Sequence, residues 1–235
     1  MRPLHALLLF LLLLGGCRGT RPPGPIENPG DPDAALRALL PELRGLRAPN
    51  QGGETGLGED ERSVRMAEAL RRLRQLELRH PRHAPTLTTA AAVAAEQGDR
   101  DRAIALLDQV AAGQPGFVPA ALLRASIAAE EGNLGLARRR LEEALLEHPD
   151  DPRLHQSLAG VLHLSGDGAL ARSELSLARQ LWGEDAPPGQ HEYHLGLIAE
   201  SEGRPEEAVL HYRAGLLEAP EDRQMAARLR ALEAR

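Results

Sequence analysis

The chain has 235 residues, with 34 acidic and 28 basic side chains, a formal net charge of −6 and only 2% aromatic residues. The acidic balance and the scarcity of aromatic side chains for base stacking exclude a nucleic-acid-binding protein. A composition dominated by alanine and leucine favours closely packed helices over a strand-rich sheet, so we expect an all-α protein.

Residues 1–17 follow the order of a secretory signal. Arg2 supplies a positive charge, Leu4 to Leu14 is an almost unbroken apolar run that is too short to span a membrane, and small residues precede Cys17. Leu14-Gly15-Gly16-Cys17 resembles the cleavage box of bacterial lipoproteins. The resemblance implies that residues 1–16 are a lipoprotein signal peptide and that Cys17 carries the lipid. The alternative is an ordinary cysteine beside a general signal-peptidase site.

The predicted lipid would hold the protein on a membrane without a transmembrane segment. Arg18 follows the cysteine, so the aspartate of the inner-membrane retention signal is absent. We therefore expect attachment to the outer membrane, facing the periplasm, with the inner membrane as the alternative. Cys17 is the only cysteine in the chain, so no intramolecular disulfide can form.

Residues 17–60 are predicted to be a tether. Thr20 to Pro32 is rich in proline and glycine and has too few apolar residues to fold. Residues 33–46 show the leucine spacing of a helix, which Pro41 interrupts, so a short kinked helix is expected there. Asn50 to Asp60 carries four glycines and is predicted to be a loop. The folded domain is expected to cover residues 61–235.

A pattern of glycine, alanine and leucine recurs every 34 residues after this tether. The residues that repeat at this interval are Gly98, Gly132 and Gly166, then Ala103, Ala137 and Ala171, then Leu107, Leu141 and Leu175. A fourth copy at Gly203, Ala208 and Tyr212 follows about three residues later than the period requires. A period of this length predicts a solenoid of stacked helix pairs. Each glycine is expected to end a first helix in the left-handed conformation, and the next residue to cap the second helix: Gly98-Asp99, Gly132-Asn133 and Gly166-Asp167.

This pattern of small residues, one bulky residue and a closing proline resembles the tetratricopeptide repeat (TPR) family. The repeats are residues 84–117, 118–151, 152–185 and 189–222, with a short insertion between Trp182 and Pro188. The phase extends backwards to Val64–Arg79, the second helix of a degenerate repeat whose first helix we expect to have become the Gly-rich loop. Residues 223–235 are expected to form a capping helix. The expected fold is thus a right-handed TPR superhelix of about ten helices.

The resemblance implies a groove lined by the first helices, with a partner protein as its occupant. The expected groove residues are Thr88, Ala92, Leu122, Ser126, Arg153, Gln156, Gly160, His163, Tyr193, Leu197 and Glu200. An extended or helical peptide segment is expected to lie there. The alternative is that these side chains only pack between neighbouring helices. Whether residues 33–46 fold back into the groove remains open, as does the oligomeric state.

An enzyme is the less favoured hypothesis. His191-Glu192-Tyr193-His194 is one residue short of the zinc-protease helix motif, and no third ligand is indicated. No nucleophile elbow or phosphate loop is present in the sequence, and no cofactor is expected. The sequence thus predicts a non-catalytic, membrane-anchored scaffold for a cell-envelope complex, such as a pilotin-like adaptor or a scaffold of secretion or cell-wall machinery. A zinc-dependent or hydrolytic enzyme that uses His191 and His194 is the alternative.

Overall fold

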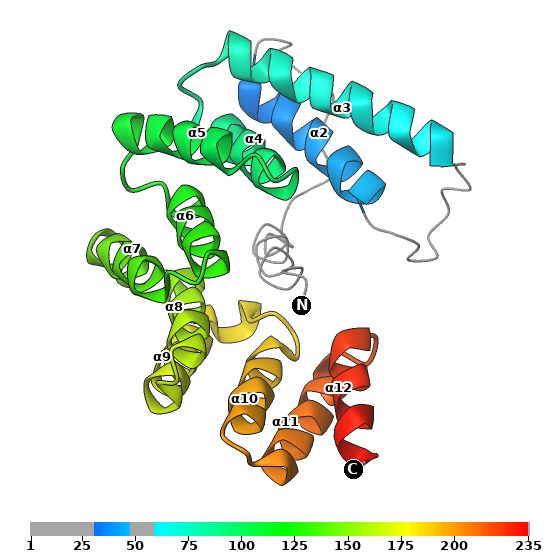
Figure 1. Cartoon of the computed structure of the whole chain (residues 1–235), viewed down its shortest axis with the longest axis vertical. Coiled ribbons are helices and arrows are strands. Elements are labelled where there is room, and N and C mark those ends of the chain that lie inside the picture. The colour runs from blue at the N-terminus through cyan, green and yellow to red at the C-terminus, as the bar shows by residue number, and fades with distance from the viewer. Residues whose placement is uncertain (1–30, 48–58, 235) are drawn as a thin grey trace. The chain divides into compact units, whose positions relative to one another are not determined.

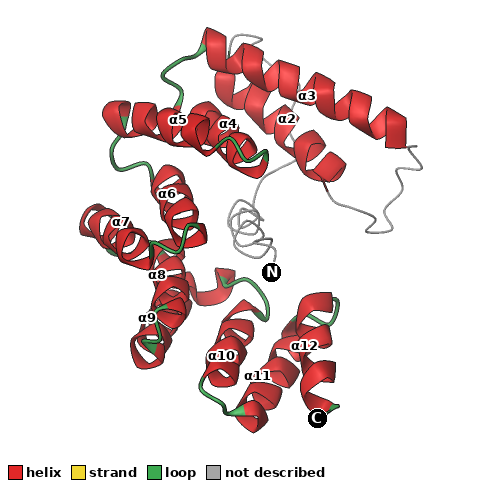
Figure 2. Cartoon of the chain, viewed as in Figure 1, coloured by secondary structure: helices red, strands yellow, loops and turns green. Residues whose placement is uncertain are grey.

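The computed structural model describes residues 31–47 and 59–234. These residues form eleven α-helices and one short 3₁₀ turn, with no strand among them (Figure 2). The all-α prediction is confirmed. Within this part of the chain, no helix combines the length and the apolar character that a membrane span requires. The predicted signal peptide 1–16, Cys17 and most of the Gly-rich loop lie outside the described residues.

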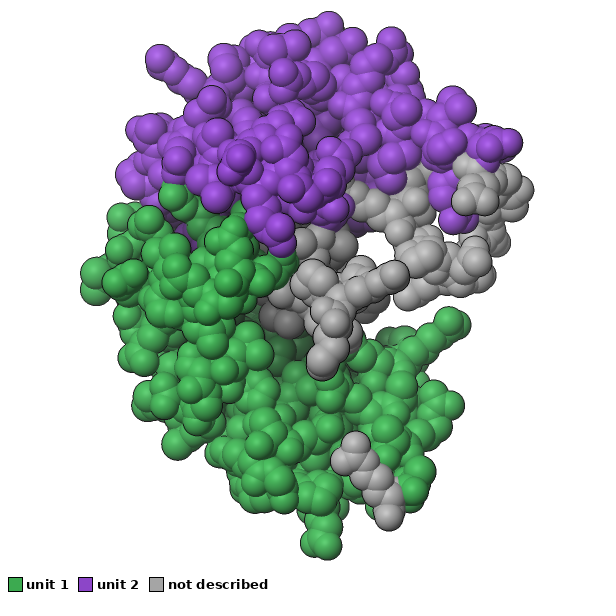
Figure 3. Space-filling view, in the orientation of Figure 1, with its two compact units in different colours: residues 1–16, 124–235 green, residues 17–123 purple. Residues whose placement is uncertain are grey.

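The chain divides into two compact units between Leu123 and Arg124 (Figure 3). Of the described residues, 31–47 and 59–123 belong to the N-terminal unit and 124–234 to the C-terminal unit. The boundary falls inside helix α6 (Val118–Glu130), the first helix of the second repeat. The segment expected to be one repeat domain is therefore distributed over two units.

The N-terminal unit begins with a helix that the sequence assigned to the tether. Helix α2 (Pro32–Arg47) packs against α3 (Glu59–Arg79) and α4 (Ala84–Glu96) (Figure 1). Its side chains Leu36, Leu39 and Leu43 are buried. The helix runs through Pro41, which lies on its exposed side. His83, just before α4, contacts Asp33 of α2 with its Nε2 atom at 3.1 Å. The predicted helix exists, but it is part of the folded unit rather than of a tether.

Helix α2 also changes the interpretation of the degenerate repeat. It pairs with α3 as α4 pairs with α5 (Arg100–Gly113), and it touches the first helix of the next repeat. The Gly-rich loop therefore joins two helices of one repeat and does not replace the first of them. Ala69 and Leu73 of α3 are buried, as their phase in the repeat predicts.

The C-terminal unit continues the succession of paired helices after α7 (Leu134–Glu147). The third repeat is α8 (Pro152–Leu164) with α9 (Gly168–Trp182), and the 3₁₀ turn η1 (Gly183–Asp185) follows it. The fourth repeat is α10 (Gln190–Ser201) with α11 (Pro205–Glu218), and α12 (Arg223–Glu233) packs on α11. Met225 of α12 joins Ala199, Ala208 and Tyr212 in one buried cluster. The last helix thus covers the final repeat, as expected of a cap.

Glycine turns close the helix pairs with one repeated geometry. Gly98 has a φ of +83°, which residues with a Cβ rarely adopt. Its N–H bonds to the carbonyl of Ala95 at 3.0 Å, and the N–H of Asp99 bonds to that of Ala94 at 2.9 Å, which defines a Schellman motif. The same two bonds recur at the turns of the other three repeats, around Gly132, Gly166 and Gly203. The glycine predictions at positions 98, 132 and 166 are therefore confirmed.

The predicted caps after these glycines are confirmed at two of three turns. The side chains of Asp99 and Asn133 each accept a hydrogen bond from the backbone N–H three residues later, at 3.2 Å. Asp167 occupies the same position before α9, but its side chain accepts no such bond. Its carboxylate lies 3.9 Å from Arg138 of α7 instead.

One pair of positions, 16 residues apart, recurs in each repeat, with one member on the first helix and the other on the second. In the first three repeats the pair is alanine and leucine, all of them buried: Ala91 with Leu107, Ala125 with Leu141, and Ala159 with Leu175. In the fourth repeat it is Gly196 and Tyr212. A methyl group on Gly196 would overlap Cε1 of the Tyr212 ring and lie 2.7 Å from Cδ1 and Cζ. The larger ring on the second helix thus requires glycine on the first.

Candidate functional site

The groove residues predicted in the N-terminal unit are closed to solvent. Thr88, Ala92 and Leu122 are 3%, 6% and 4% exposed. The Thr88 hydroxyl is buried and has no hydrogen-bond partner among the described residues. This burial agrees with the alternative that these residues pack between helices, and their role in binding stays a prediction.

The residues predicted in the C-terminal unit lie partly at the surface. Gln156 is buried. The other predicted residues of this unit are half-buried: Ser126, Arg153, Gly160, His163, Tyr193, Leu197 and Glu200. Four of these side chains gather around α10. Gln156 and His163 reach it from α8, and Tyr193 and Glu200 extend from it toward α11 and α12.

Two polar contacts join α8 to α10. The Gln156 Nε2 atom lies 3.2 Å from Nε2 of His194, and the Ser201 hydroxyl lies 3.4 Å from Nδ1 of His163. The Arg153 guanidinium bonds to Asp151, the N-cap of α8, at 3.0 and 2.6 Å. Burial would raise the pKa of Asp151, but hydrogen bonds and charge from Arg153 lower it overall. Arg153 is thus already held by its own helix cap.

On its other side α10 carries an aromatic and charged cluster. The Tyr193 and Tyr212 ring centroids are 6.1 Å apart. Glu200 accepts a hydrogen bond from the Tyr212 hydroxyl and another from Arg228 of α12 at 3.0 Å. Burial, reinforced by the Glu200 carboxylate, raises the pKa of Tyr212, so its hydroxyl stays protonated. Glu200 and Arg228 therefore neutralise each other beside two tyrosine rings.

Two small pockets lie between α8, α9 and α10, and His194 lines both of them. The first holds about 270 Å³, its open mouth included, and is bounded by Gln156, Leu175, Ala178, Arg179, Trp182, Ala186, Pro187, Gln190, His191 and His194. The second holds about 180 Å³ between Ala159, Gly160, His163, Leu175, His194 and Ile198. The insertion that delays the fourth repeat supplies Ala186 and Pro187 to the first pocket.

The turn that carries this insertion is held against α11. The Gly189 N–H bonds to Glu218 at 2.8 Å, and Arg179 contacts the same carboxylate at 3.5 Å. Gly189 has a φ of +69°, and a Cβ at this position would lie 2.7 Å from the carbonyl oxygen of Gly215. The Trp182 Nε1 atom beside this turn is buried and has no partner among the described residues. Such an unsatisfied donor costs about 1–3 kcal/mol.

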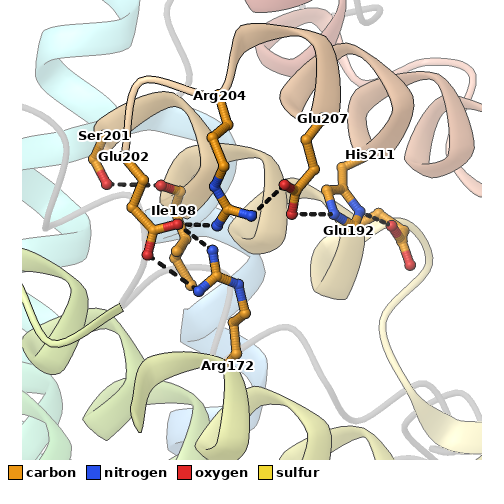
Figure 4. A network of polar contacts seen from close by, with 8 residues as sticks. All are labelled: Arg172, Glu192, Ile198, Ser201, Glu202, Arg204, Glu207 and His211. Carbon is orange, nitrogen blue, oxygen red and sulfur yellow. Dashed lines mark hydrogen bonds and ion pairs between the residues drawn. The ribbon is translucent and has the colours of Figure 1, made fainter. Parts of the chain in front are cut away.

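A chain of charged side chains also spans α9, α10 and α11 (Figure 4). Arg172 and Arg204 both bind the carboxylate of Glu202, and Arg204 also binds Glu207. His211 lies 2.7 Å from Glu192 and 3.7 Å from Glu207. These groups are partly exposed, so each pair contributes at most about 1 kcal/mol.

The two histidines of the zinc alternative have different surroundings. His191 lines the first pocket, and burial lowers its pKa. His194 is buried, and its Nε2 atom faces the Gln156 amide. In the described part of the chain, no group of three or more His, Cys, Asp or Glu side chains could hold a metal ion.

Sequence reasoning missed the partners of the residues that it selected. Arg228, which binds Glu200, stands in a segment treated only as a cap. The sequence suggested His194 as a zinc ligand but not as the partner of Gln156. The two residues lie 38 positions apart, which is about one repeat plus the insertion, so they occupy similar positions in consecutive repeats. That spacing is the only signal in the sequence that could have paired them.

Comparisons with known proteins identify the fold. No protein-family model matches the sequence, and no curated protein is significantly similar to it. A TPR protein from Thermus thermophilus has a similar structure, with a TM-score of 0.69, 20% identity, and coverage of 87% of this chain and 100% of that one. A TPR protein from Parabacteroides merdae is also similar, with a TM-score of 0.60, 18% identity, and coverage of 99% of this chain and 86% of that one.

PilW, a widely conserved type IV pilus biogenesis factor, is also similar, with a TM-score of 0.60, 16% identity, and coverage of 85% of this chain and 83% of that one. Identities this low show the fold alone. The fold is a TPR helical solenoid.

Proposed function

We propose that the protein is a non-catalytic, membrane-anchored scaffold that binds a segment of a partner protein and helps to assemble or localise a cell-envelope complex. The TPR fold carries this proposal. Stacked repeats offer extended surfaces on which a peptide can lie. In the C-terminal unit such a surface consists of the half-buried residues of the first helices α8 and α10.

The partner segment is expected to bind mainly through apolar and aromatic contacts. Arg153 is paired with Asp151, and Glu200 with Arg228, so these charges are already satisfied within the chain. Tyr193 and Leu197 remain as half-buried side chains of α10. Large aromatic and aliphatic side chains supply most of the binding energy at such sites. An extended or helical segment with an apolar stripe meets this requirement.

The anchor in this proposal is a lipid on Cys17. Its support is the order of charged, apolar and small residues before that cysteine. Changing Cys17 to serine should abolish labelling by a fatty-acid analogue in growing cells and move the protein from the membrane fraction to the soluble fraction. Unchanged labelling of the Cys17→Ser protein would refute the anchor and leave the scaffold role intact.

Pilus assembly is the first process to test, because PilW, a pilus biogenesis factor, has a similar structure. Secretion and cell-wall synthesis are the other envelope processes considered. A photo-crosslinking amino acid at Leu197 should capture a discrete envelope protein in intact cells. The matched control is Leu217 on α11, which is 85% exposed. If positions 197 and 217 gave the same diffuse products, the proposal of a partner on α10 would fail.

A further inference from the structure

The junction between the third and fourth repeats encloses a histidine, His194. His194 of α10 is only 7% exposed and lies in the wall of both pockets. Its Nε2 atom is 3.2 Å from the Gln156 Nε2 atom, whose N–H groups are donors. This arrangement needs an unprotonated Nε2 that accepts the bond, so the ring is neutral. The contact joins α8 to α10 through the interior of the junction.

A proton on His194 would have no negative partner in these pockets. All the pocket residues belong to the described part of the chain, and none of them is acidic. The charged or titratable groups nearest the ring are His163 on α8, Arg179 on α9 and His191 on α10, with Tyr193 at 5.7 Å from the ring. The carboxylates farther out act on the neighbouring histidines, Glu202 on His163 and Glu192 and Glu218 on His191, whereas the charged groups that act on His194 itself are the two histidines. Glu218 of α11 contacts Arg179 at 3.5 Å. An imidazolium would therefore be enclosed mainly among groups that are positive or can become positive.

We propose that the junction of α8 and α9 with α10 is an acid-sensitive joint, which opens when His194 takes up a proton. On protonation, Nε2 becomes a donor that faces the Gln156 amide donors. The enclosed charge is relieved most directly by letting water reach the ring. The two pockets that His194 lines give that water a place to enter.

The direction of the pH dependence follows from the burial of the ring. Desolvation, helped by the nearby His163 and His191, lowers the pKa of His194 from 6.5 to about 4. Burial also lowers the pKa values of His163 and His191. In an open junction His194 regains its ordinary pKa of 6.5. Between pH 6.5 and about pH 4 the open form therefore binds more protons than the closed form. The closed junction is favoured above pH 6.5 and loses stability as the pH falls toward 4.

Opening would change the surface that α10 presents, and this consequence rests on the proposed function. Tyr193, Leu197 and Glu200 share α10 with His194. When α10 moves relative to α8, a partner that touches both helices loses part of its contact. Release of the partner in mild acid is the expected result.

The experiment uses the full chain and a natural probe. Trp182 is the only tryptophan, and it lines the same pocket as His194. We would follow Trp182 fluorescence from pH 7 to pH 4. Over the same range we would measure hydrogen exchange at the α10 amides and correct the rates for the intrinsic effect of pH. The His194 pKa shift predicts that the opening equilibrium rises about 20-fold at pH 5 and about 100-fold at pH 4. No change down to pH 4 would overturn the proposal.

Three variants separate this joint from general acid unfolding. His194→Gln keeps a hydrogen-bond acceptor but cannot take up a proton, so its junction should lose most of this acid response and keep only the part that His163 and His191 contribute. His148→Gln removes a histidine that lines neither pocket and should behave like the natural chain. Gln156→Glu places a carboxylate beside His194 and should make mild acid close the junction instead of opening it. A His194→Gln protein that opened in acid like the natural chain would refute the proposal, and so would a Gln156→Glu protein with an unchanged response.

Discussion

Replacing Gly196 by alanine tests whether the fourth repeat depends on close contact between Gly196 and the Tyr212 ring. The new methyl group would overlap Cε1 of that ring. The ring cannot move freely, because it is fully buried among Ala199, Ala208 and Met225. Overpacking of this kind costs about 1–3 kcal/mol. Alanine returns up to about 1 kcal/mol through its better helix propensity, but displacing Tyr212 also weakens its hydrogen bond to Glu200. We expect a net loss of about 1–3 kcal/mol in the stability of the C-terminal unit.

Chemical denaturation followed by Trp182 fluorescence measures this loss, because the only tryptophan belongs to the C-terminal unit. Gly160→Ala is the matched control, since a Cβ at Gly160 would meet nothing within 4 Å. That variant should gain about 0.5–1 kcal/mol from helix propensity. If both variants changed stability by the same amount, the contact with Tyr212 would not be the cause.

A double variant tests the complementarity of the two positions. Gly196→Ala combined with Tyr212→Leu recreates the alanine–leucine pair of the first three repeats. Tyr212→Leu alone leaves a space beside Gly196 that the added methyl group can fill. The double variant should therefore be more stable than the sum of the two single losses predicts, by about 1–3 kcal/mol. Agreement with that sum to within about 0.5 kcal/mol would refute the reasoning.

Three further predictions concern other parts of the chain. Gly215→Ala brings a methyl group 2.5 Å from the sulfur of Met225, but this flexible side chain can move aside, so denaturation should show a smaller loss than for Gly196→Ala. Asp99→Ala removes a cap bond and should cost about 0.5–2 kcal/mol, whereas Asp167→Ala removes none and should stay within about 0.5 kcal/mol of the natural chain. Equal losses at both positions in thermal unfolding would contradict the cap assignment. Pro41→Ala restores a backbone donor inside α2 and should slow hydrogen exchange in that helix, with a gain of about 1–3 kcal/mol in stability. Unchanged or faster exchange would show that Pro41 does not strain the helix.

The repeats were predictable because their signals are local. Gly98 and its equivalents mark turns whose hydrogen bonds connect residues no more than five apart. Leu107 and its equivalents fall on the buried face of a helix by spacing alone. The sequence missed the role of α2, because the long Gly-rich segment separates it from α3 and breaks the 34-residue phase. The spacing of the leucines at 36, 39 and 43 predicted the helix, but it did not indicate that their buried face packs on the first repeats.

The candidate site was less predictable, because it depends on contacts between repeats. The positions of Tyr193 and Glu200 on a first helix follow from the repeat pattern. Their contacts with Tyr212 and Arg228 depend on how α10 meets α11 and α12, which no local pattern specifies. Asp167 shows the same limit: its residue type suits a cap, but its side chain makes no cap bond.

The glycine turns also bear on the order in which the molecule forms during synthesis. Each first helix is joined to its partner by bonds within a few residues, so a helix hairpin can form as soon as its own segment has emerged. The α4–α5 hairpin needs nothing beyond Gly113 for this step. The α10–α11 hairpin differs, because its central cluster includes Met225 of α12. Nascent chains that stop before residue 225 should therefore contain early repeats in native form and a last repeat that is still open to proteases.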